Sequence, residues 1–417
     1  MPPFPSCMSA MKTPPLPLGV DEALTLIPGL PNDVGAQILS MVPYSHHSRI
    51  KPTCKSWCLF LSSENLISLR HHLRRLSHLL CVFPQDPSVS SPYLFDPHNL
   101  AWRPLPHMPC NPHVYGLCNF TSVSLGPHLY VLGGSLFDTR SFPMDRPSPS
   151  SSAFRFNFVT FSWDQLSPML SPRGSFACAA IPSLGQIIVA GGGSRHTLFG
   201  AAGSRMSSVE RYDVARDEWV AMDGLPRYRA GCVGFLAGNA EDMEFWVMGG
   251  YGESRTISGV FPVDEYYKDA VVMDVNRHEW REMGVMWREG DRARLGKIVV
   301  VEDEVWGQPG VFMLDNNDIF RYNMGSNSWY IEATVPRKSP FNASFGFVAL
   351  DGELYVMSLL KGIDSTEPRR SRQQKRAGSL FIQIYSPTKK TWRSLMTKPP
   401  LNCPLDFNTA VMCTIRL

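Results

Sequence analysis

The spacing of hydrophobic positions changes once along the chain. Between residues 27 and 70, apolar residues recur every three to four positions, which is the period of helices with one buried face. From residue 79 onward, runs of four to six residues rich in Val, Phe and Trp alternate with Gly, Asn and Asp, which predicts short antiparallel strands. The pattern therefore predicts a small helical region followed by a large β domain.

The β region is built from a repeated unit, and its clearest copy runs from Tyr228 to Met283. This copy contains four apolar runs, at 231–236, 245–248, 270–275 and 279–283. The second run ends in Gly249 and Gly250, which predicts a backbone with positive φ or close approach to a neighbour, where a Cβ atom would clash. The unit therefore predicts a four-stranded antiparallel meander.

A tryptophan in the fourth run marks each copy of the unit. Six such markers occur, at Trp102, Trp163, Trp219, Trp280, Trp329 and Trp392. Gly-Gly pairs follow the second run at 133–134, 191–192 and 249–250, whereas the last two copies lack the pair. The unit resembles the kelch repeat, whose period is near 50 residues and whose fold is a β-propeller. The resemblance covers roughly residues 79–417 and implies a mainly β fold, a six-bladed kelch β-propeller.

The two ends of the β region predict how the ring closes. The first copy has runs at 79–83, at 93–96 and around Trp102, but no small apolar strand before them. The last segment, 409–417, is such a strand without partners of its own. Pairing this segment into the first copy would leave no open sheet edge, so we expect the propeller, 79–417, to be closed by the C-terminal strand.

The helical region, 23–62, resembles the F-box, and the matching positions are spread along it. They are Leu30, Pro31, Asp33, Ile38, Leu39, Pro43, Cys54, Lys55 and Trp57. Departures include Thr53, where the family usually has Val. The family binds a Skp1-type adaptor, and through it a cullin. The resemblance implies adaptor contacts at Leu30, Pro31, Val34, Ile38, Leu39, Pro43 and Trp57. For Trp57, a place in the three-helix core is an equal alternative.

Two flanking segments complete the predicted organisation. Residues 1–22 are rich in Pro and Met, which predicts a disordered tail. Residues 63–78 predict a helical linker with an apolar stripe that starts at Leu66 and continues to Leu80. Arg70 and the two arginines at 74 and 75 lie off this stripe, so we expect them on a solvated side.

Strand direction predicts which face of the propeller binds a client protein. Because strands alternate, the loops from strand two to three and those from blade to blade emerge on one face. The long inserts, 135–152, 193–206, 251–268 and 359–378, are such loops, and long loops on a rigid scaffold usually carry binding. Arginines in the blade-to-blade segments predict a site for an acidic or phosphorylated client: Arg173, Arg227, Arg229, Arg292, Arg294 and Arg337. The alternative is that these arginines bridge neighbouring blades.

Composition narrows the classes of protein to which the chain could belong. A formal net charge of +3 does not indicate nucleic-acid binding, and no apolar run reaches the length of a membrane span. Ten cysteines without CxxC pairs indicate reduced thiols in the nucleus and/or cytoplasm. A basic cluster at 369–376 is either a nuclear import signal or a solvated loop. The spacing of His107, Cys110, His113 and Cys118 is interrupted by prolines, so no metal or cofactor is expected.

The sequence contains no catalytic constellation. It lacks GxSxG, HExxH and GxxxxGK[ST] patterns and a RING-type zinc pattern, so an enzyme is not expected. The helical region and repeats together resemble plant F-box/kelch-repeat proteins. That resemblance implies the substrate-recognition subunit of a Skp1–cullin–F-box ubiquitin ligase, which binds a target protein through its propeller. Two alternatives remain: a kelch scaffold without a ligase role, and a propeller enzyme of the galactose oxidase or sialidase kind.

Overall fold

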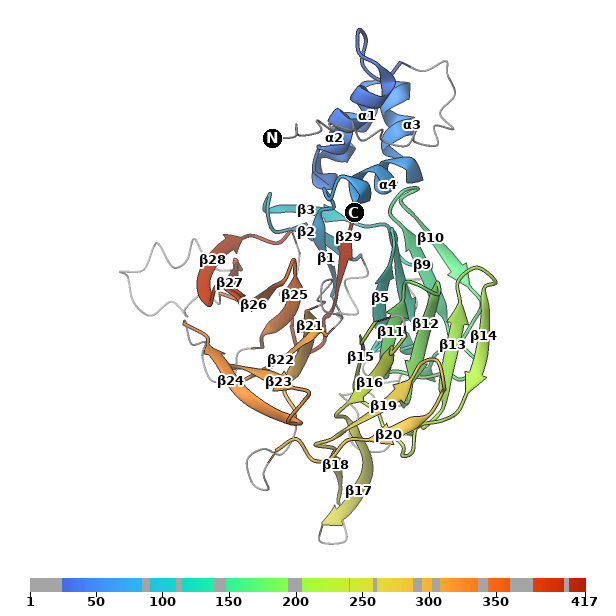
Figure 1. Cartoon of the computed structure of the whole chain (residues 1–417), viewed down its shortest axis with the longest axis vertical. Coiled ribbons are helices and arrows are strands. Elements are labelled where there is room, and N and C mark those ends of the chain that lie inside the picture. The colour runs from blue at the N-terminus through green and yellow to red at the C-terminus, as the bar shows by residue number, and fades with distance from the viewer. Residues whose placement is uncertain are drawn as a thin grey trace, which may run out of the picture.

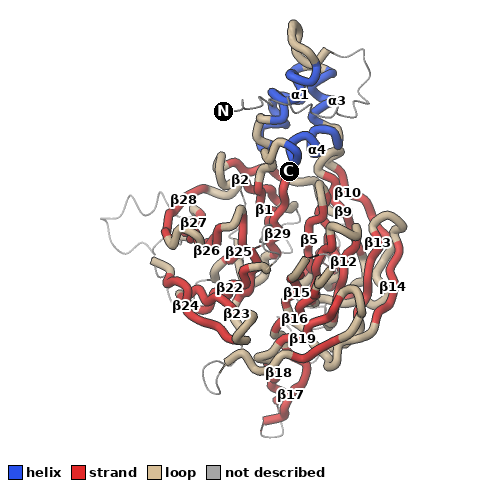
Figure 2. The backbone as a smooth tube through the Cα atoms, viewed as in Figure 1, coloured by secondary structure: helices blue, strands red, loops and turns tan. Residues whose placement is uncertain are grey.

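The computed structural model shows a small helical head on a ring of β-sheets (Figure 1). It describes residues 25–84, 91–109, 115–138, 148–193, 205–239, 241–257, 261–287, 295–301, 308–336, 344–360, 378–400 and 405–417. The predicted tail, 1–22, lies outside these ranges. Helices are confined to the N-terminal part of the described chain, and strands begin at His78 (Figure 2).

The head consists of four short α-helices and two 3-10 turns. In chain order these are α1 (Asn32–Ser40), η1 (Tyr44–His46), α2 (His47–Ile50), η2 (Lys51–Thr53), α3 (Lys55–Leu61) and α4 (Glu64–His72). Its core is a cluster of Leu26, Ala36, Leu39, Phe60, Leu61, Leu66 and Leu69. Because Leu66 and Leu69 belong to this core, α4 is a structural part of the head.

The predicted helical linker, 63–78, is therefore wrong in its extent and its role. The helix α4 ends at His72, and the first strand, β1, begins at His78. Leu80 belongs to β1 and packs in the propeller. In this short leucine-rich stretch, the apolar residues fit both the spacing of a strand and that of a helix. The hydrophobic pattern alone therefore placed the end of the helix too late in the chain.

Six four-stranded sheets form the ring, which confirms the predicted six-bladed propeller. Blade 1 contains β29 (Val411–Arg416), β1 (His78–Phe83), β2 (Tyr93–Asp96) and β3 (Ala101–Pro104). Blade 2 contains β5 (Thr121–Leu125), β6 (His128–Leu132), β9 (Ala153–Asn157) and β10 (Ser162–Leu166). Blade 3 contains β11 (Ala177–Ile181), β12 (Gln186–Ala190), β13 (Val209–Asp213) and β14 (Glu218–Met222).

The remaining three blades follow in chain order. Blade 4 contains β15 (Val233–Ala237), β16 (Glu244–Met248), β19 (Ala270–Asp274) and β20 (Trp280–Glu282). Blade 5 contains β21 (Lys297–Val301), β22 (Gly310–Asp315), β23 (Asp318–Asn323) and β24 (Ser328–Thr334). Blade 6 contains β25 (Gly346–Leu350), β26 (Glu353–Leu359), β27 (Leu380–Ser386) and β28 (Thr391–Thr397). Each hydrophobic cluster of the ring spans two neighbouring blades, so burial between blades holds the ring together.

The ring closes as predicted. Strand β29 pairs antiparallel with β1, from His78 opposite Arg416 to Phe83 opposite Val411. The chain's last strand thus supplies the innermost strand of the blade that contains its first strand. The edge of β1 that would otherwise be open is paired, which removes a site for unwanted strand addition.

The tryptophan markers have a physical role, because most of them tie one blade to the next. The indole Nε1 of Trp163 donates to the Pro106 carbonyl oxygen at 2.8 Å, and that of Trp219 donates to the Ser167 carbonyl oxygen at 2.9 Å. In blade 1, Trp102 donates to Thr397 Oγ1 of blade 6 at 3.0 Å. This last bond joins the two ends of the ring a second time.

Two further sheets extend the propeller. Strand β4 (Tyr115–Cys118) pairs with β7 (Ser135–Asp138), and β7 pairs with β8 (Ser148–Pro149). Strands β17 (Tyr251–Ile257) and β18 (Phe261–Tyr266) form a hairpin within the blade 4 insert. The hairpin and the helical head lie at opposite ends of the molecule's long axis (Figure 1).

Candidate functional site

The head presents a stripe of exposed apolar side chains along α1. Their exposed fractions are 40% for Leu30, 37% for Val34, 43% for Ile38 and 62% for Met41. Val34 and Ile38 are four residues apart in α1, so they lie on one face of the helix, whereas Leu30 precedes the helix and Met41 follows it. Exposed apolar side chains gathered on one face mark a surface that binds a partner.

Two predicted adaptor contacts are instead held inside the head. Leu39 is 2% exposed and packs in the head's core, so it supports α1 from behind. Trp57 packs against the same core, and its Nε1 donates to the Leu26 carbonyl oxygen at 2.7 Å. Pro31 is exposed and Pro43 is half-buried. The expectation of direct contact is therefore corrected for Leu39, and the core alternative describes Trp57.

A buried arginine joins the head to the ring. The guanidinium of Arg70, on α4, donates to the carbonyl oxygens of Ser40 at 2.8 Å and Val42 at 2.6 Å, next to the end of α1. It also donates to Leu417, which follows β29, at 3.2 Å. Burial lowers the pKa of Arg70 to about 10. The expectation that Arg70 lies on a solvated side is wrong, because the docked ring covers it.

An aromatic side chain of the head reaches into the propeller core. Tyr44 belongs to the hydrophobic cluster between blades 1 and 2, and its Oη donates to the Phe158 carbonyl oxygen at 2.9 Å. The guanidinium of Arg103 in β3 lies 5.8 Å from the centre of the Tyr44 ring. Together, Tyr44 and Arg70 fix the orientation of the exposed stripe relative to the ring.

A histidine completes this junction. The imidazole Nε2 of His47 lies 3.0 Å from the Val42 carbonyl oxygen, while its buried Nδ1 has no hydrogen-bond partner within the described residues. Burial lowers the pKa of His47 to about 4, and the positive charge of Arg70 adds to this effect. His47 is therefore neutral at physiological pH, with Nε2–H as the donor.

On the propeller, Arg173 is fully buried and links blades 2 and 3. Its guanidinium donates to Gly191 and Ser208 carbonyl oxygens at 2.9 and 2.8 Å, and forms an ion pair with Glu210. Its own carbonyl oxygen accepts from Gly134 N at 2.7 Å. The expected contact between Arg173 and a client is corrected, because every part of this side chain lies inside the protein.

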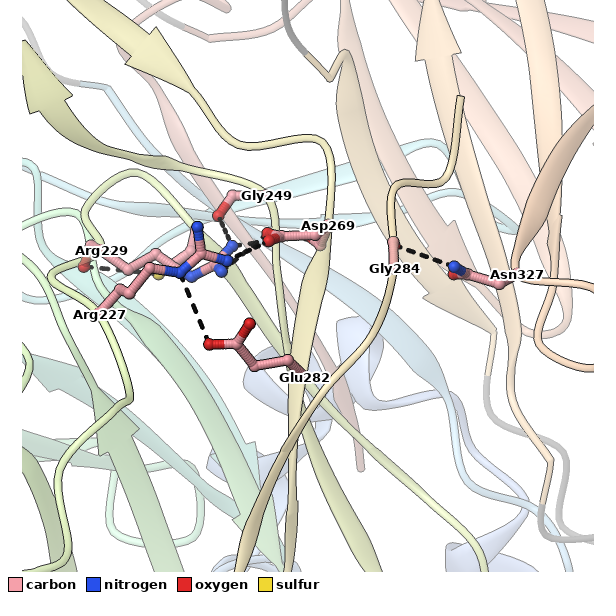
Figure 3. Close-up of polar contacts among 8 residues, drawn as sticks. Arg227, Arg229, Gly249, Asp269, Glu282, Gly284 and Asn327 are labelled. Carbon is pink, nitrogen blue, oxygen red and sulfur yellow. Dashed lines mark hydrogen bonds and ion pairs between the residues drawn. The ribbon is translucent and has the colours of Figure 1, made fainter. Parts of the chain in front are cut away.

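Blade 4 repeats the arrangement with Arg229 (Figure 3). Arg229 is buried and donates to the Gly249 carbonyl oxygen at 2.7 Å and to Asp269 Oδ1 at 2.8 Å. Its carbonyl oxygen accepts from Gly192 N of blade 3 at 2.8 Å. The same correction applies to Arg229. We call this arrangement, at Arg173 and at Arg229, the arginine latch.

The other predicted arginines differ in their surroundings. Arg227 is 38% exposed, pairs with Asp269, and lies 4.9 Å from the centre of the Tyr267 ring. It remains within reach of a partner on the face that carries the inserts. Arg292, Arg294 and Arg337 lie outside the described residues, as does the basic cluster at 369–376.

The seam between blades 4 and 5 carries a cavity that sequence reasoning missed. Its volume is about 870 Å³, and its lining includes Gly249, Leu295, Lys297, Asn317 and Phe345. The ammonium of Lys297 donates to the Phe345 carbonyl oxygen at 2.6 Å and also to the Phe407 carbonyl oxygen. The signal that could have indicated it is the two-residue turn at Asn316 and Asn317, where other copies of the repeat have long inserts.

Strand topology places the head and the cavity on opposite faces of the ring. The head contacts Leu417 at the end of a first strand and Phe158 between a third and a fourth strand. The cavity is lined instead by residues at the starts of first strands and between second and third strands. The latter is the face on which the inserts were expected, and it carries the β17–β18 hairpin.

Other site classes find no support in the described part of the chain. It holds no group of three or more metal-ligating side chains. Cys110 and His113 of the spacing considered above lie outside the described residues. None of the described helices is long and apolar enough to span a membrane.

Comparison with known proteins identifies the family. A Kelch motif matches residues 116–170, which cover all four strands of blade 2 and part of the segment that leads to blade 3. The chain is 64% identical over 416 residues to F-box/kelch-repeat protein OR23 of Arabidopsis thaliana, covering 96% of this chain and 93% of that protein. The chain belongs to the F-box/kelch-repeat family.

More distant relatives carry the same description. F-box/kelch-repeat protein SKIP30 of Arabidopsis thaliana is 29% identical over 51% of this chain and 58% of its own length. F-box/kelch-repeat protein SKIP20 of the same plant is 25% identical over 68% of this chain and 72% of its own length. The helical head is thus the F-box of this F-box/kelch-repeat protein, and the ring is its kelch propeller.

Proposed function

We propose that the chain is the substrate-recognition subunit of a Skp1–cullin–F-box ubiquitin ligase. The F-box binds a Skp1-type adaptor, and through it a cullin, while the propeller binds the client protein. The observation that carries the proposal is the exposed stripe of Leu30, Val34 and Ile38 on the F-box, opposite the insert-bearing face of the propeller. The chain supplies proximity: it raises the concentration of the client near the ubiquitin-conjugating enzyme and needs no catalytic group of its own.

The junction supports this mechanism because it makes one body of two binding parts. Tyr44 and Arg70 bond the F-box to blades 1 and 2 through buried contacts. A fixed orientation restricts where a bound client meets the ligase, which is the condition under which proximity raises a rate. A flexible tether would spread the client over a larger volume.

The adaptor contact is tested by calorimetry with the purified chain and a purified plant Skp1-type adaptor. Val34→Lys combined with Ile38→Lys places two charges on the exposed stripe, and we expect at least about a hundredfold loss of affinity. The matched control is Val220→Lys combined with Ile331→Lys, which adds the same two charges at exposed apolar residues of blades 3 and 5. If the wild-type chain unfolds normally but does not bind the adaptor, the result would instead favour a kelch scaffold without a ligase role.

A further inference from the structure

The cavity between blades 4 and 5 opens on the face opposite the F-box. Only Asn316 and Asn317 connect β22 to β23, so blade 5 has no insert between these strands to cover the seam. A Cβ atom added at Gly249 would lie 2.5 Å from Leu295 Cδ1, so these two residues meet across the seam.

Lys297 gives the cavity a positive charge that is bonded to neutral groups. Its ammonium bonds two neutral carbonyl oxygens, those of Phe345 and Phe407, and forms no ion pair within the described residues. Burial lowers the pKa of Lys297 to about 8, and the carboxylate of Asp406 opposes this effect from a distance. A partly desolvated ammonium gains most from an opposite charge that approaches it directly.

A second polar atom indicates what else the ligand carries. The Oδ1 atom of Asn317 is buried and accepts no hydrogen bond within the described residues, and Asn317 lines the cavity. A buried oxygen without a donor is unfavourable, and a backbone N–H of a ligand would satisfy it. Tyr266 and Phe345 add aromatic surface to the walls. A peptide offers this combination of charge, N–H donors and apolar area.

We propose that this cavity binds an acidic side chain of the client protein, with the client's carboxylate paired to the ammonium of Lys297. The proposal rests on the proposed function, because it assigns to the insert-bearing face the chemistry of the client that the propeller holds. Asn317 accepts an N–H group from the same segment of the client. The short turn of blade 5 leaves the approach open.

A carboxylate fits this cavity better than a phosphate does. Asp315 also lines it and adds a negative charge. A single lysine among the described lining residues suits a ligand group with a single charge, whereas a phosphate carries between one and two charges near neutral pH. Phosphate sites in proteins usually contain arginine forks, and the two latch arginines on this face are buried.

The experiment selects random decapeptides, displayed on phage, on the immobilised full-length chain. We expect enrichment of peptides that contain Asp or Glu. The best peptide, labelled with fluorescein, is then measured by fluorescence polarisation. Lys297→Met is expected to weaken its binding at least about tenfold, and Lys297→Arg to restore most of it. Changing the peptide's acidic residue to its amide should weaken binding to the wild-type chain as much as Lys297→Met does. The same change should not alter the affinity of the peptide for the Lys297→Met chain.

Controls separate this proposal from a loss of fold and from the proposed function. Lys389→Met removes the same charge from a turn of blade 6 and should leave peptide binding unchanged. Asn317→Asp is a second variant, nearly equal in shape, and should weaken acidic peptides by adding a negative charge to the wall. Lys297→Met should bind the adaptor with the same affinity as the wild-type chain. If the wild-type chain binds the peptide but not the adaptor, the result contradicts only the proposed function. Selection without acidic enrichment would overturn the cavity assignment. So would tighter binding when phosphoserine replaces the acidic residue of the best peptide, or equal binding by Lys297→Met.

Discussion

Among the described residues, three arginines at seams between parts of the molecule differ from a lysine at another seam in how they are paired. Arg70, Arg173 and Arg229 are fully buried, and each guanidinium donates to acceptors inside the protein. Arg173 and Arg229 reach the neighbouring blade through their own carbonyl oxygens, which accept from backbone N–H groups. Lys297 bonds two carbonyl oxygens on one side of its seam and lines a cavity on the other. The comparison teaches that a cation whose partners all lie inside the protein holds elements together. A cation that faces a cavity is the candidate for binding a partner.

The largest effect is expected where a side chain would break an arginine latch. Gly191 has φ of +69°, and a Cβ added there would lie 2.2 Å from the Arg229 carbonyl oxygen. Gly191→Ala should therefore lower the free energy of unfolding by about 5 kcal/mol, as measured by urea denaturation. Gly185 is the matched control, because its φ is +62° but nothing lies within 4 Å. Gly185→Ala should cost only about 1 kcal/mol, from backbone strain. Similar losses for the two variants would mean that the latch is not tightly packed.

Removing a latch cation is the next largest change. Arg173→Met leaves the carboxylate of Glu210 buried without its charge partner, and we expect a loss of about 4 kcal/mol of stability. Arg393→Met removes a cation from an exposed pair with Glu353 and should change stability by less than about 1 kcal/mol. The two are compared by thermal and urea unfolding. If both variants were equally stable, the latch would not be a structural device.

The junction of the F-box with the ring should weaken in acid because of His47. Its pKa is about 4 in the folded chain, against an ordinary value of 6.5, so the unfolded chain binds the extra proton between these values. The stability that neutral His47 contributes is therefore complete above about pH 6.5 and is lost as the pH falls to about 4, by up to about 3 kcal/mol. His47→Gln should flatten this part of the stability profile. An unchanged slope in urea titrations at pH 4 to 7 would contradict the assignment.

The smallest expected effect distinguishes the tryptophan bonds of blades 3 and 5. Trp219 donates to a carbonyl oxygen at 2.9 Å, whereas Trp329 donates to the sulfur of Met286 at 3.4 Å. Sulfur is a weak acceptor, so Trp219→Phe should cost about 1 kcal/mol more than Trp329→Phe. Both variants lose the same ring area, which leaves the hydrogen bond as the main difference. Equal losses would show that packing alone ties these blades.

The repeats explain why so much of the fold could be predicted from the sequence. Each marker tryptophan recurs with its strand, so the strands of every blade could be counted. The apolar segment at the C-terminus had no partner of its own, and the first copy of the repeat lacked one strand. Ring closure between β1 and β29 followed from this count. Helical spacing predicted that Val34 and Ile38 share one face of α1, and the resemblance to the F-box added Leu30.

The partners of single charged side chains could not be predicted in the same way. The arginines at 173 and 229 precede innermost strands, but the sequence does not show that nearby carbonyl oxygens, such as that of Gly191, form a socket for the guanidinium. Arg70 lies off the apolar stripe of α4, yet it is buried by the ring, which is distant in sequence. Position in a repeat therefore predicted the face on which these arginines lie, and tertiary contacts decided their exposure.

The central claim is that one rigid chain holds an adaptor and a client on opposite faces, and affinity capture from plant tissue with three baits tests it most directly. The baits are wild type, the double variant Val34→Lys with Ile38→Lys, and Lys297→Met, each compared by quantitative mass spectrometry. We predict that the double variant loses the adaptor and the cullin and retains or accumulates a client. Lys297→Met should keep both ligase subunits and lose that client. Retention of the adaptor by the double variant, or loss of adaptor and client together in either variant, would contradict the account.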